Sequence, residues 1–293
     1  MFVRRLFVFL CSMAFVFSKL YSNQEKQFLD GIRQIPARDR WAIESFLKIL
    51  MLQENGAYVL FGDKPVVYTA YYDFSKKEVY SAFRRKSGLV NKQIRQGWEA
   101  WEKYAHLFPS NRFLLKGTPS DDHQRVEIIL IDKERFKNKF EEYLHEFQSI
   151  LGKDVTASSL LSRYEKENVM FFDLLKEHHA LLGILLGYGS ENSWLFHLRD
   201  RTYEDIHRVD LQPSLMANSA KEYAIYQGML KGAFPEKNHQ KPYKFLYLPM
   251  FLVNPKSKET KELRQKYLRQ RENIHRVYCH GNFLEITLER LSS

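Results

Sequence analysis

Two adjacent histidines that follow a glutamate are the clearest candidates for chemistry in this chain. Glu177, His178 and His179 precede an aliphatic run, and Asn192 and Trp194 follow it after two glycines. Imidazole and carboxylate groups can act as general acids and bases or bind a metal. Neighbouring helical positions diverge by about 100°, so His178 and His179 cannot readily grip one ion, and no H-E-x-x-H pattern is present. No metal site and no cofactor are predicted from this stretch.

The same stretch also has a structural interpretation as a core helix. Over 168–187 the apolar residues recur at helical spacing, and His178 lies near the centre of their stripe while His179 lies at its edge. We therefore expect His178 to be a hydrogen-bonded core residue. Gly183 should allow a second helix to approach closely, and Gly187 should end the helix in the left-handed conformation.

Ser190 is expected to cap the helix that follows, over 191–200, which carries Trp194. Glu177, His179 and Asn192 would then lie at the polar edge of a helical hairpin. This edge is where a cleft could form.

Three shorter stretches are weaker candidates. Asp121 to His123 form a polar cluster in a loop, for which solvated turn residues are a simpler interpretation than a metal site. Cys279 stands at the end of a predicted helix and is interpreted as structural. The turn between two predicted strands contains Asp63 and Lys64, which would be exposed at a hairpin tip as candidate binding residues.

Helical periodicity dominates the rest of the chain. Helices are predicted over 24–54, 92–108, 133–151, 156–165, 168–187, 191–200 and 256–279, with Asp132 as the cap of the third. Strands are predicted over 58–61, 66–72, 112–117 and 125–131, the first two as a β-hairpin, and an extended segment over 243–253. The expected fold class is α+β, a predominantly helical single domain with a small antiparallel sheet.

The N-terminal residues have the pattern of a secretory signal peptide. Arg4 and Arg5 precede an apolar run of 12 residues, Leu6–Phe17, and Ser18 follows this run. The run is short for a membrane span, which needs about 20 residues, so residues 1–18 are interpreted as a cleaved signal, with an uncleaved anchor as the alternative. The single domain would occupy residues 19–293. Cleavage would leave Cys279 as the last cysteine, which excludes an intrachain disulfide.

The basic balance of the chain bears on its partners. The net charge is +10, and cleavage would remove two of 45 basic residues and none of 35 acidic ones, leaving +8. Acidic and basic residues alternate over 256–276, which is typical of a solvated helix face and argues against nucleic acid as the partner. An anionic membrane surface or an acidic macromolecule is a better match for this charge in an exported protein.

Four stretches carry a resemblance to a known family. They read YVLFGDKPV over 58–66, EHHALLGILLGYGSENSWLFH over 177–197, FLVNPKSKETKELRQKY over 251–267 and GNFLEITLERL over 281–291. Together they resemble a family of uncharacterised exported proteins of chlamydia-like bacteria, over most of the chain after residue 18. The resemblance implies export or membrane anchoring in an obligate intracellular bacterium. It implies no activity, catalytic residue or cofactor.

Two functional hypotheses follow. The first is an exported, periplasmic or secreted protein without catalytic activity that binds an unknown macromolecule of the envelope or host. The alternative is a hydrolase with an unrecognised site near Glu177, His178 and Asn192 in the predicted hairpin over 177–194.

Overall fold

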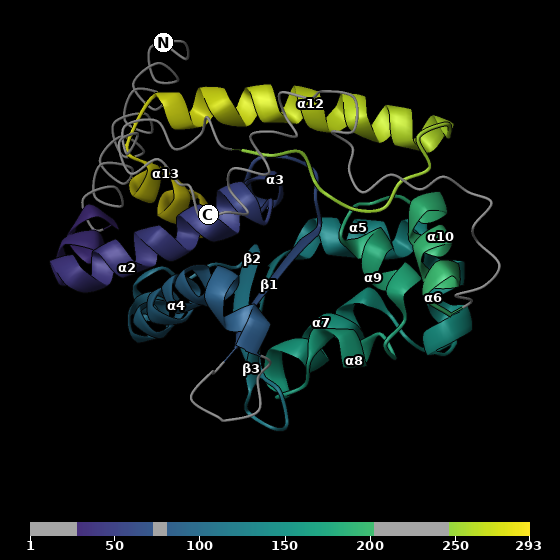
Figure 1. Ribbon diagram of the computed structural model, residues 1–293, viewed down its shortest axis with the longest axis horizontal. Helices are drawn as coiled ribbons and strands as arrows, with labels where there is room; N and C mark the ends of the chain where they lie inside the picture. The colour runs from purple at the N-terminus through teal and green to yellow at the C-terminus, as the bar shows by residue number, and fades with distance from the viewer. Residues whose placement is uncertain (1–27, 73–80, 202–245) are drawn as a thin grey trace, which may run out of the picture.

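A three-stranded antiparallel sheet lies at the centre of a mostly helical chain, which confirms the predicted α+β class (Figure 1). The computed structural model describes residues 28–72, 81–201 and 246–293, and it describes side chains in these ranges except for 81–87 and 200–201. The predicted signal or anchor over 1–18 lies outside the described residues.

The sheet has the order β1-β3-β2, with β1 over Val66–Tyr72, β2 over Phe113–Pro119 and β3 over Arg125–Asp132. The central strand β3 pairs with both neighbours, so that Val66 is opposite Ile131 and Phe113 is opposite Asp132. Alternation of side chains along each strand sends apolar groups to both faces of the sheet. Such a sheet must be covered by helices on both sides.

The helices are, in chain order, α2 (Ala37–Lys48), the π-helix η1 (Ile49–Gln53), α3 (Ala57–Leu60), α4 (Ser81–Tyr104), the 3₁₀-helix η2 (Ala105–Leu107), α5 (Lys133–Glu142), α6 (Leu144–Leu151), α7 (Ala157–Lys166), α8 (Phe171–Leu174), α9 (His179–Leu185), α10 (Ser190–Arg201), α12 (Lys258–Cys279) and α13 (Phe283–Leu291). Residues 28–34 are also helical. Residues 246–253, the described part of the segment predicted to be extended, form no helix, and Val253 makes an isolated bridge.

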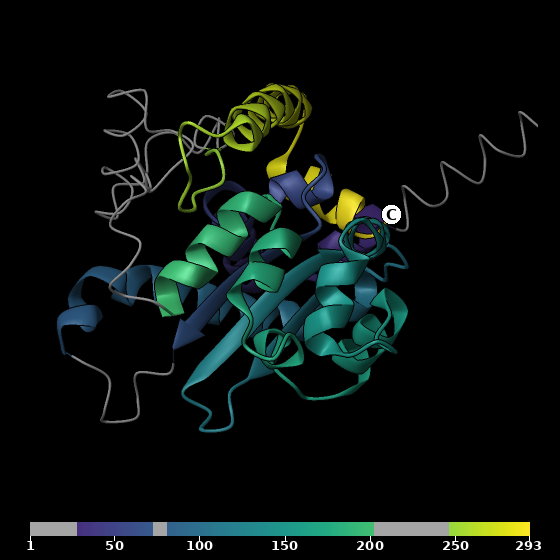
Figure 2. The same ribbon diagram turned by 90° about the vertical axis from the view of Figure 1, so that its right-hand side faces the viewer.

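Two hydrophobic cores occupy the two faces of the sheet. Val67, Ile128 and Leu130 face the first core, which α2, α3, α4, α12 and α13 cover. Ile129 and Ile131 face the second core, which α5 to α9 cover. Figures 1 and 2 show these two groups of helices on opposite sides of the sheet.

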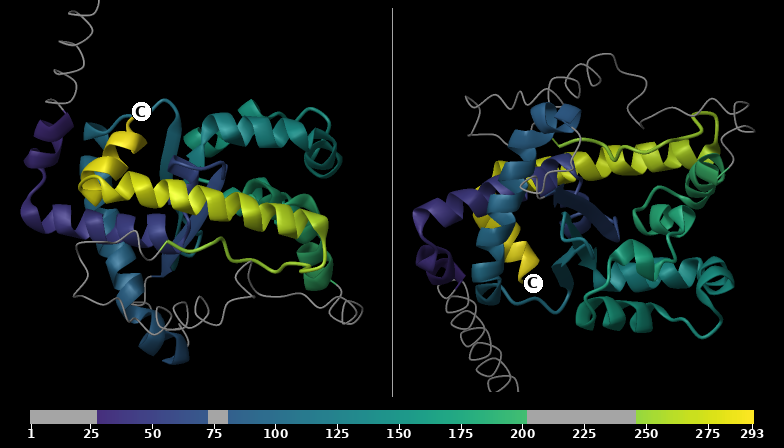
Figure 3. Two further views of the ribbon diagram at one scale, coloured as in Figure 1. Left: turned by 90° about the horizontal axis from the view of Figure 1, so that it is seen from above. Right: turned by 60° about the horizontal axis from the view of Figure 1, so that its bottom comes forward.

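The long helix α12 crosses one end of both layers. Seen from above in Figure 3, it extends from α2 and α13 at one end to α10 at the other. Its 22 residues give a length of about 33 Å. Tyr267, Ile274 and Tyr278 on its inner side are buried, and Tyr267 meets Tyr58 edge on with 5.3 Å between ring centroids.

The structure corrects several of the predicted elements. The predicted helix over 24–54 is interrupted at residues 35 and 36 in its described part. Residues 58–61 do not form a hairpin strand, because Ala57–Leu60 is the helix α3 and β1 pairs with β3 instead. All four residues of α3 are buried in the first core, so packing outweighs their β propensity. The helix predicted over 133–151 is also interrupted, since Tyr143 takes a non-helical conformation between α5 and α6.

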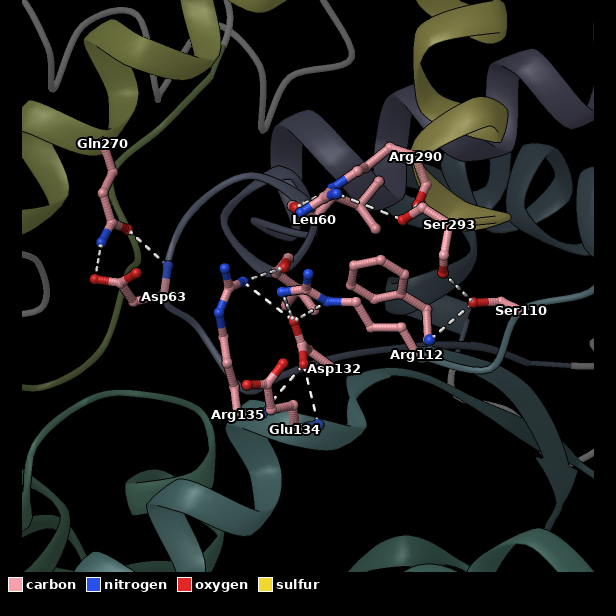
Figure 4. A network of polar contacts seen from close by, with 12 residues as sticks. Leu60, Asp63, Ser110, Arg112, Asp132, Glu134, Arg135, Gln270, Arg290 and Ser293 are labelled. Carbon is pink, nitrogen blue, oxygen red and sulfur yellow. Dashed lines mark hydrogen bonds and ion pairs between the residues drawn. The ribbon is translucent and has the colours of Figure 1, made fainter. Parts of the chain in front are cut away.

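A buried carboxylate joins the two layers. Asp132 ends β3 and caps α5 as predicted, because its Oδ1 accepts hydrogen bonds from the backbone N–H groups of Glu134 and Arg135 at 3.1 Å each. Its Oδ2 accepts two hydrogen bonds from Arg112, at 3.0 and 2.8 Å, and lies 3.4 Å from Nη1 of Arg135 (Figure 4). The side chain of Asp132 has no exposed surface.

The arginines of this network extend it to the first core. Arg135 donates to the carbonyl of Val59 at 2.7 Å and Arg290 of α13 donates to that of Leu60 at 2.9 Å (Figure 4). These carbonyls belong to the last turn of α3, where no intrahelical donor is available. One carboxylate and three guanidinium groups therefore connect β3, α3, α5, α13 and the residue that precedes β2.

Asp132→Asn should destabilise the protein by about 3–5 kcal/mol, because it removes the one negative charge that Arg112 and Arg135 share in a buried site. Urea unfolding at neutral pH measures this free energy. Asp30→Asn is the matched control, since Asp30 pairs with Arg33 on the surface and should contribute about 0–1 kcal/mol. Equal losses in the two variants would contradict the role given to Asp132.

Candidate functional site

The predicted helix over 168–187 is interrupted at the residues expected to do chemistry. Helix α8 ends at Leu174, and Lys176 and Glu177 take left-handed φ values of 52° and 55°. The ammonium of Lys176 donates to the carbonyl of Ile150 at 2.8 Å. This turn places His178 at the start of α9 and leaves Glu177 exposed.

His178 lies in an aromatic cluster between α9 and α10. It is 8% exposed, its ring stacks on that of His197 with 3.8 Å between centroids, and Trp194 meets it edge on at 5.3 Å. His179 is partly buried between Phe172 and Phe196. His178 is therefore buried, as its interpretation as a core residue required, although it does not lie on the continuous helix predicted for it.

The side chain of Asn192 connects the start of α10 to the start of α12 and to the residues before it. Its Nδ2 donates to the carbonyl of Tyr188 at 3.1 Å and to Glu259 at 3.3 Å. Its Oδ1 accepts from the backbone of Asn254 at 3.0 Å and from the hydroxyl of Thr260 at 3.1 Å. These four bonds use the capacity of a carboxamide, which is 1% exposed. The exposed Glu177, the buried His178 and the saturated Asn192 are thus not assembled into one site.

Glu259 of α12, and not Ser190, caps α10. Its carboxylate accepts hydrogen bonds from the backbone N–H groups of Ser190 at 2.8 Å, Glu191 at 3.3 Å and Asn192 at 3.2 Å. Gly189, with φ of 85°, makes this approach feasible, since a Cβ there would lie 2.4 Å from Cδ of Glu259. A carboxylate at a helix N-terminus satisfies free N–H groups and the helix dipole together. The first turn of α12 is thereby fixed to α10.

The glycines of the hairpin behave as predicted. Gly187 has φ of 77° and ends α9 in the left-handed region, and Gly183 faces α10, where a Cβ would lie 2.5 Å from the hydroxyl of Ser193. The carbonyl of Gly187 accepts a hydrogen bond from the hydroxyl of Tyr267 at 2.7 Å. The hairpin thus contacts α12 at a second point.

Asp63 and Lys64, both predicted to be exposed, differ in environment. Asp63 is exposed and contacts α12, accepting from Nε2 of Gln270 at 2.8 Å and lying 3.5 Å from the ammonium of Lys266 (Figure 4). Lys64 is only 1% exposed, so the prediction for it is wrong. The reason is that the turn folds under α12, where the Lys64 ammonium lies 5.4 Å from the ring centroid of Tyr188.

Inside the protein, the charges of Lys64 and Glu54 act on one another, which the sequence did not indicate. Burial lowers the pKa of Lys64 from 10.5 to about 7, and the charge of Glu54 opposes this change. Burial raises the pKa of Glu54 from 4.5 to about 7, and the charge of Lys64 opposes that change. Glu54 follows η1 and keeps some exposed surface. Both groups therefore titrate near neutral pH, which is unusual outside functional sites.

A cleft of about 610 Å³ lies beside this pair, between α12, α5 and the loops at Asp63 and Gly187. Its acidic groups are neutralised within the chain: Glu142 pairs with Lys139 at 2.5 Å, and Glu259 caps α10. Tyr143 also lines it, and burial together with the charge of Glu142 raises the pKa of Tyr143 to about 12, so its hydroxyl stays protonated.

On the α12 wall of the cleft, Arg269 is exposed and forms no ion pair with any described residue. The cleft therefore offers hydrogen-bond donors and an unpaired cation, with no nucleophile beside a base among the described residues that line it.

The remaining candidates are at the surface. Asp122 accepts from the hydroxyl of Ser120 at 2.6 Å in the turn between β2 and β3, and His123 is left-handed there. Cys279 is an exposed free thiol at the end of α12. Among the described residues, no group of three or more His, Cys, Asp or Glu side chains could hold a metal ion. No helix in the described ranges is long and apolar enough to cross a membrane.

A comparison of the chain with protein-family models, curated proteins and solved structures finds no match.

Glu259→Gln should destabilise the protein by about 1–2 kcal/mol, because it removes the charge that caps α10. Urea unfolding measures this loss, and amide hydrogen exchange should show faster exchange at Ser190 to Asn192. Glu262→Gln, one turn further along α12, is the control, since its pair with Lys258 is exposed and should change stability little. Unchanged exchange in Glu259→Gln would contradict the capping role.

Replacing the buried pair, by Glu54→Gln with Lys64→Met, should stabilise the protein most near pH 7. The cost of Glu54 is absent below pH 4.5 and grows as pH rises towards 7, because its folded pKa is raised. The cost of Lys64 is absent above pH 10.5 and grows as pH falls towards 7, because its folded pKa is lowered. The two costs are therefore largest together at neutral pH, and the gain there should be about 1–4 kcal/mol.

Urea unfolding of the double variant and the wild type at pH 5, 7 and 9.5 tests this profile. Glu44→Gln with Lys48→Met is the control, since that pair on α2 is partly exposed at 2.7 Å and should give a small, flat difference. A double variant that is less stable than wild type at pH 7 would show that the pair stabilises the fold.

Proposed function

We propose that this protein acts by binding another macromolecule in the cleft beside α12, and not by catalysis. The observation that carries the proposal is the cleft of about 610 Å³, lined by charged and tyrosine side chains from α5 and α12. Tyrosine and arginine are enriched where proteins bind one another. Tyr143 and Arg269 are on opposite walls, and both can donate hydrogen bonds to a ligand.

The rigidity of the cleft supports the proposal. Its α12 wall is held at the α10 end by Glu259, near its middle by Tyr267 and by Gln270 on Asp63, and near α13 by the packing of Tyr278 against Phe283. A wall fixed at several points is preorganised, so little ordering opposes binding.

The hydrolase alternative has less support. Its three residues are divided among an exposed turn, an aromatic cluster and a saturated hydrogen-bond network, and a hydrolytic site needs acid, base and substrate within hydrogen-bond reach. The best catalytic feature is instead the Glu54–Lys64 pair, in which Lys64 is shielded from solvent.

Export is part of the proposal and rests on the sequence alone. The charged segment, apolar run and small-residue end of residues 1–18 support a secreted or periplasmic location, or an N-terminal anchor. The partner would then belong to the envelope or to a host.

A photo-crosslinking amino acid at position 262, inside the cleft, should capture one discrete partner in the cells that make the protein. The same group at Glu285, exposed on α13, should not. Arg269→Glu should lower the yield at least about fivefold, because it replaces the exposed cation of the cleft with a negative charge. Lys261→Glu, the same change of charge at an exposed position of α12 that does not line the cleft, should leave the yield unchanged. Equal capture at positions 262 and 285, or equal effects of the two glutamate variants, would contradict the proposal.

A further inference from the structure

A groove of about 290 Å³ lies between α2 and α4, which pack against one another in the first layer (Figures 1 and 3). Two of its lining residues, Ala42 and Ala100, are small. Beside them the helices approach closely, because a Cβ at Gly97 of α4 would lie 2.5 Å from the carbonyl oxygen of Ala42. Small residues where the helices meet leave room between the longer side chains that line the groove.

Trp41 of α2 is the aromatic residue of this groove. It is 60% exposed, whereas Trp98 and Trp101 of α4 are each 3% exposed. Its ring contacts no other ring among the described residues, and its indole N–H donates to none of them. An indole has a flat apolar face and one polar N–H group. Both are therefore available to a ligand.

The charged side chains of the groove balance one another. Arg38 and Lys103 are basic, and Asp39 and Glu99 are acidic, so the lining has no net charge. Gln96 adds a neutral, exposed carboxamide. The N–H groups of these side chains donate hydrogen bonds, and the carboxylate and carboxamide oxygens accept them. The groove thus offers donors and acceptors together without a preference for ions of either sign.

The acidic side chains keep part of their hydrogen-bonding capacity. Asp39 accepts from the hydroxyl of Tyr104 at 3.1 Å through Oδ2, and Glu99 accepts from Nε of Arg95 at 2.8 Å through Oε1. The second oxygen of each carboxylate accepts no hydrogen bond from a described residue. Two carboxylate oxygens on opposite helices are therefore available as acceptors beside the indole.

The walls of the groove are fixed relative to one another. The hydrogen bond from Tyr104 to Asp39 joins α4 to α2, and Phe46 of α2 meets Trp98 of α4 edge on with 5.8 Å between ring centroids. Little ordering would therefore oppose binding. The volume is at the lower end of the range of about 300–1,000 Å³ for small-molecule sites, so the ligand in the groove should be small.

A neutral sugar has the chemistry that these groups would recognise. The C–H bonds on one face of a sugar ring carry a partial positive charge and can pack on the negative π-face of an indole. The hydroxyls of the sugar both donate and accept, which matches the mixed lining. A ligand bearing phosphate would require an excess of basic groups, and a cation an excess of acidic ones, and the lining has neither.

We propose that the groove between α2 and α4 binds a neutral carbohydrate, with one sugar ring stacked on Trp41 and its hydroxyls hydrogen-bonded to Asp39 and Glu99. The inference goes beyond the proposed function and does not depend on it, because none of the residues that line the groove lines the cleft beside α12.

Saturation-transfer NMR on the full chain tests the proposal with three neutral trisaccharides: maltotriose, cellotriose and tri-N-acetylchitotriose. At least one should bind saturably with a Kd of about 1–10 mM, because the site is open to solvent on one side. Trp41→Ala should weaken this binding at least about tenfold, since the stacking surface is lost. No saturable binding of any of the three up to about 20 mM, or equal binding by wild type and Trp41→Ala, would overturn the proposal.

Two pairs of variants keep the test independent of folding. Leu89→Ala, at a residue 65% exposed elsewhere on α4, should leave binding unchanged, and both it and Trp41→Ala should keep the urea unfolding midpoint of wild type. Glu99→Gln should weaken binding about threefold or more by removing a charged acceptor. Glu102→Gln, exposed on α4 outside the groove, should not. Equal effects of the two glutamine variants would overturn the proposal.

The net charge of zero gives a further test. Binding of the neutral trisaccharide should change less than about twofold between about 0.05 and 0.5 M NaCl, because screening acts on charged partners. Trigalacturonate, an anionic trisaccharide, should bind no more tightly than the neutral ones. Tighter binding of trigalacturonate that is lost at high salt would show a site for acidic polymers and would overturn the assignment to a neutral carbohydrate.

Discussion

The charge of Asp132 is the constraint on which the rest of the structure depends. The sheet has three strands, and a separate hydrophobic core lies on each of its faces. The helices of the two layers must therefore be held in place relative to one another through this small sheet. Asp132 does this at the point where β3 becomes α5: it caps the helix and pairs with Arg112, which immediately precedes β2, and with Arg135 of α5. Burial lowers the pKa of Arg290, and the charges of Arg112 and Arg135 lower it further. A single carboxylate thus fixes the geometry of both layers.

A second carboxylate has the same kind of role at the other end of the molecule. Glu259 neutralises the N-terminus of α10, and Asn192 links that turn to the start of α12. Asn192, one of the residues that looked most chemical in the sequence, is therefore used to attach the hairpin to the long helix. What remains for function is the space that this attachment creates, namely the cleft beside α12.

The sequence predicted correctly those elements that are determined by a pattern within their own residues. The strand β3, the Asp132 cap and the amphipathic helix α12 were correct because each has a strong periodic or capping signal within a few residues. The helix α3 was not predicted, because aromatic and β-branched residues favour strands until burial on all sides decides otherwise. The break before His178 depends on two left-handed non-glycine residues, which carry no reliable sequence signal.

Most of the candidate site could not be predicted, for a related reason. Glu259 lies almost 70 residues from the turn it caps, and Lys64 stands between Asp63 and Pro65 in what looks like an exposed turn. The burial of Lys64 arises because α12 folds over that turn, which is a contact between distant parts of the chain. The one local signal was misleading. The Gly-Tyr-Gly-Ser stretch at the start of α10 indicated Ser190 as the cap, whereas the carboxylate of Glu259 has that role.

The central claim, that the cleft beside α12 binds a macromolecule, is tested most directly by native mass spectrometry. The protein would be purified gently, without cross-linking, from the cells that make it. The account predicts a defined complex heavier than the chain itself, which is lost in Arg269→Glu and retained in Lys261→Glu. The mass of the chain alone in all three preparations would contradict it.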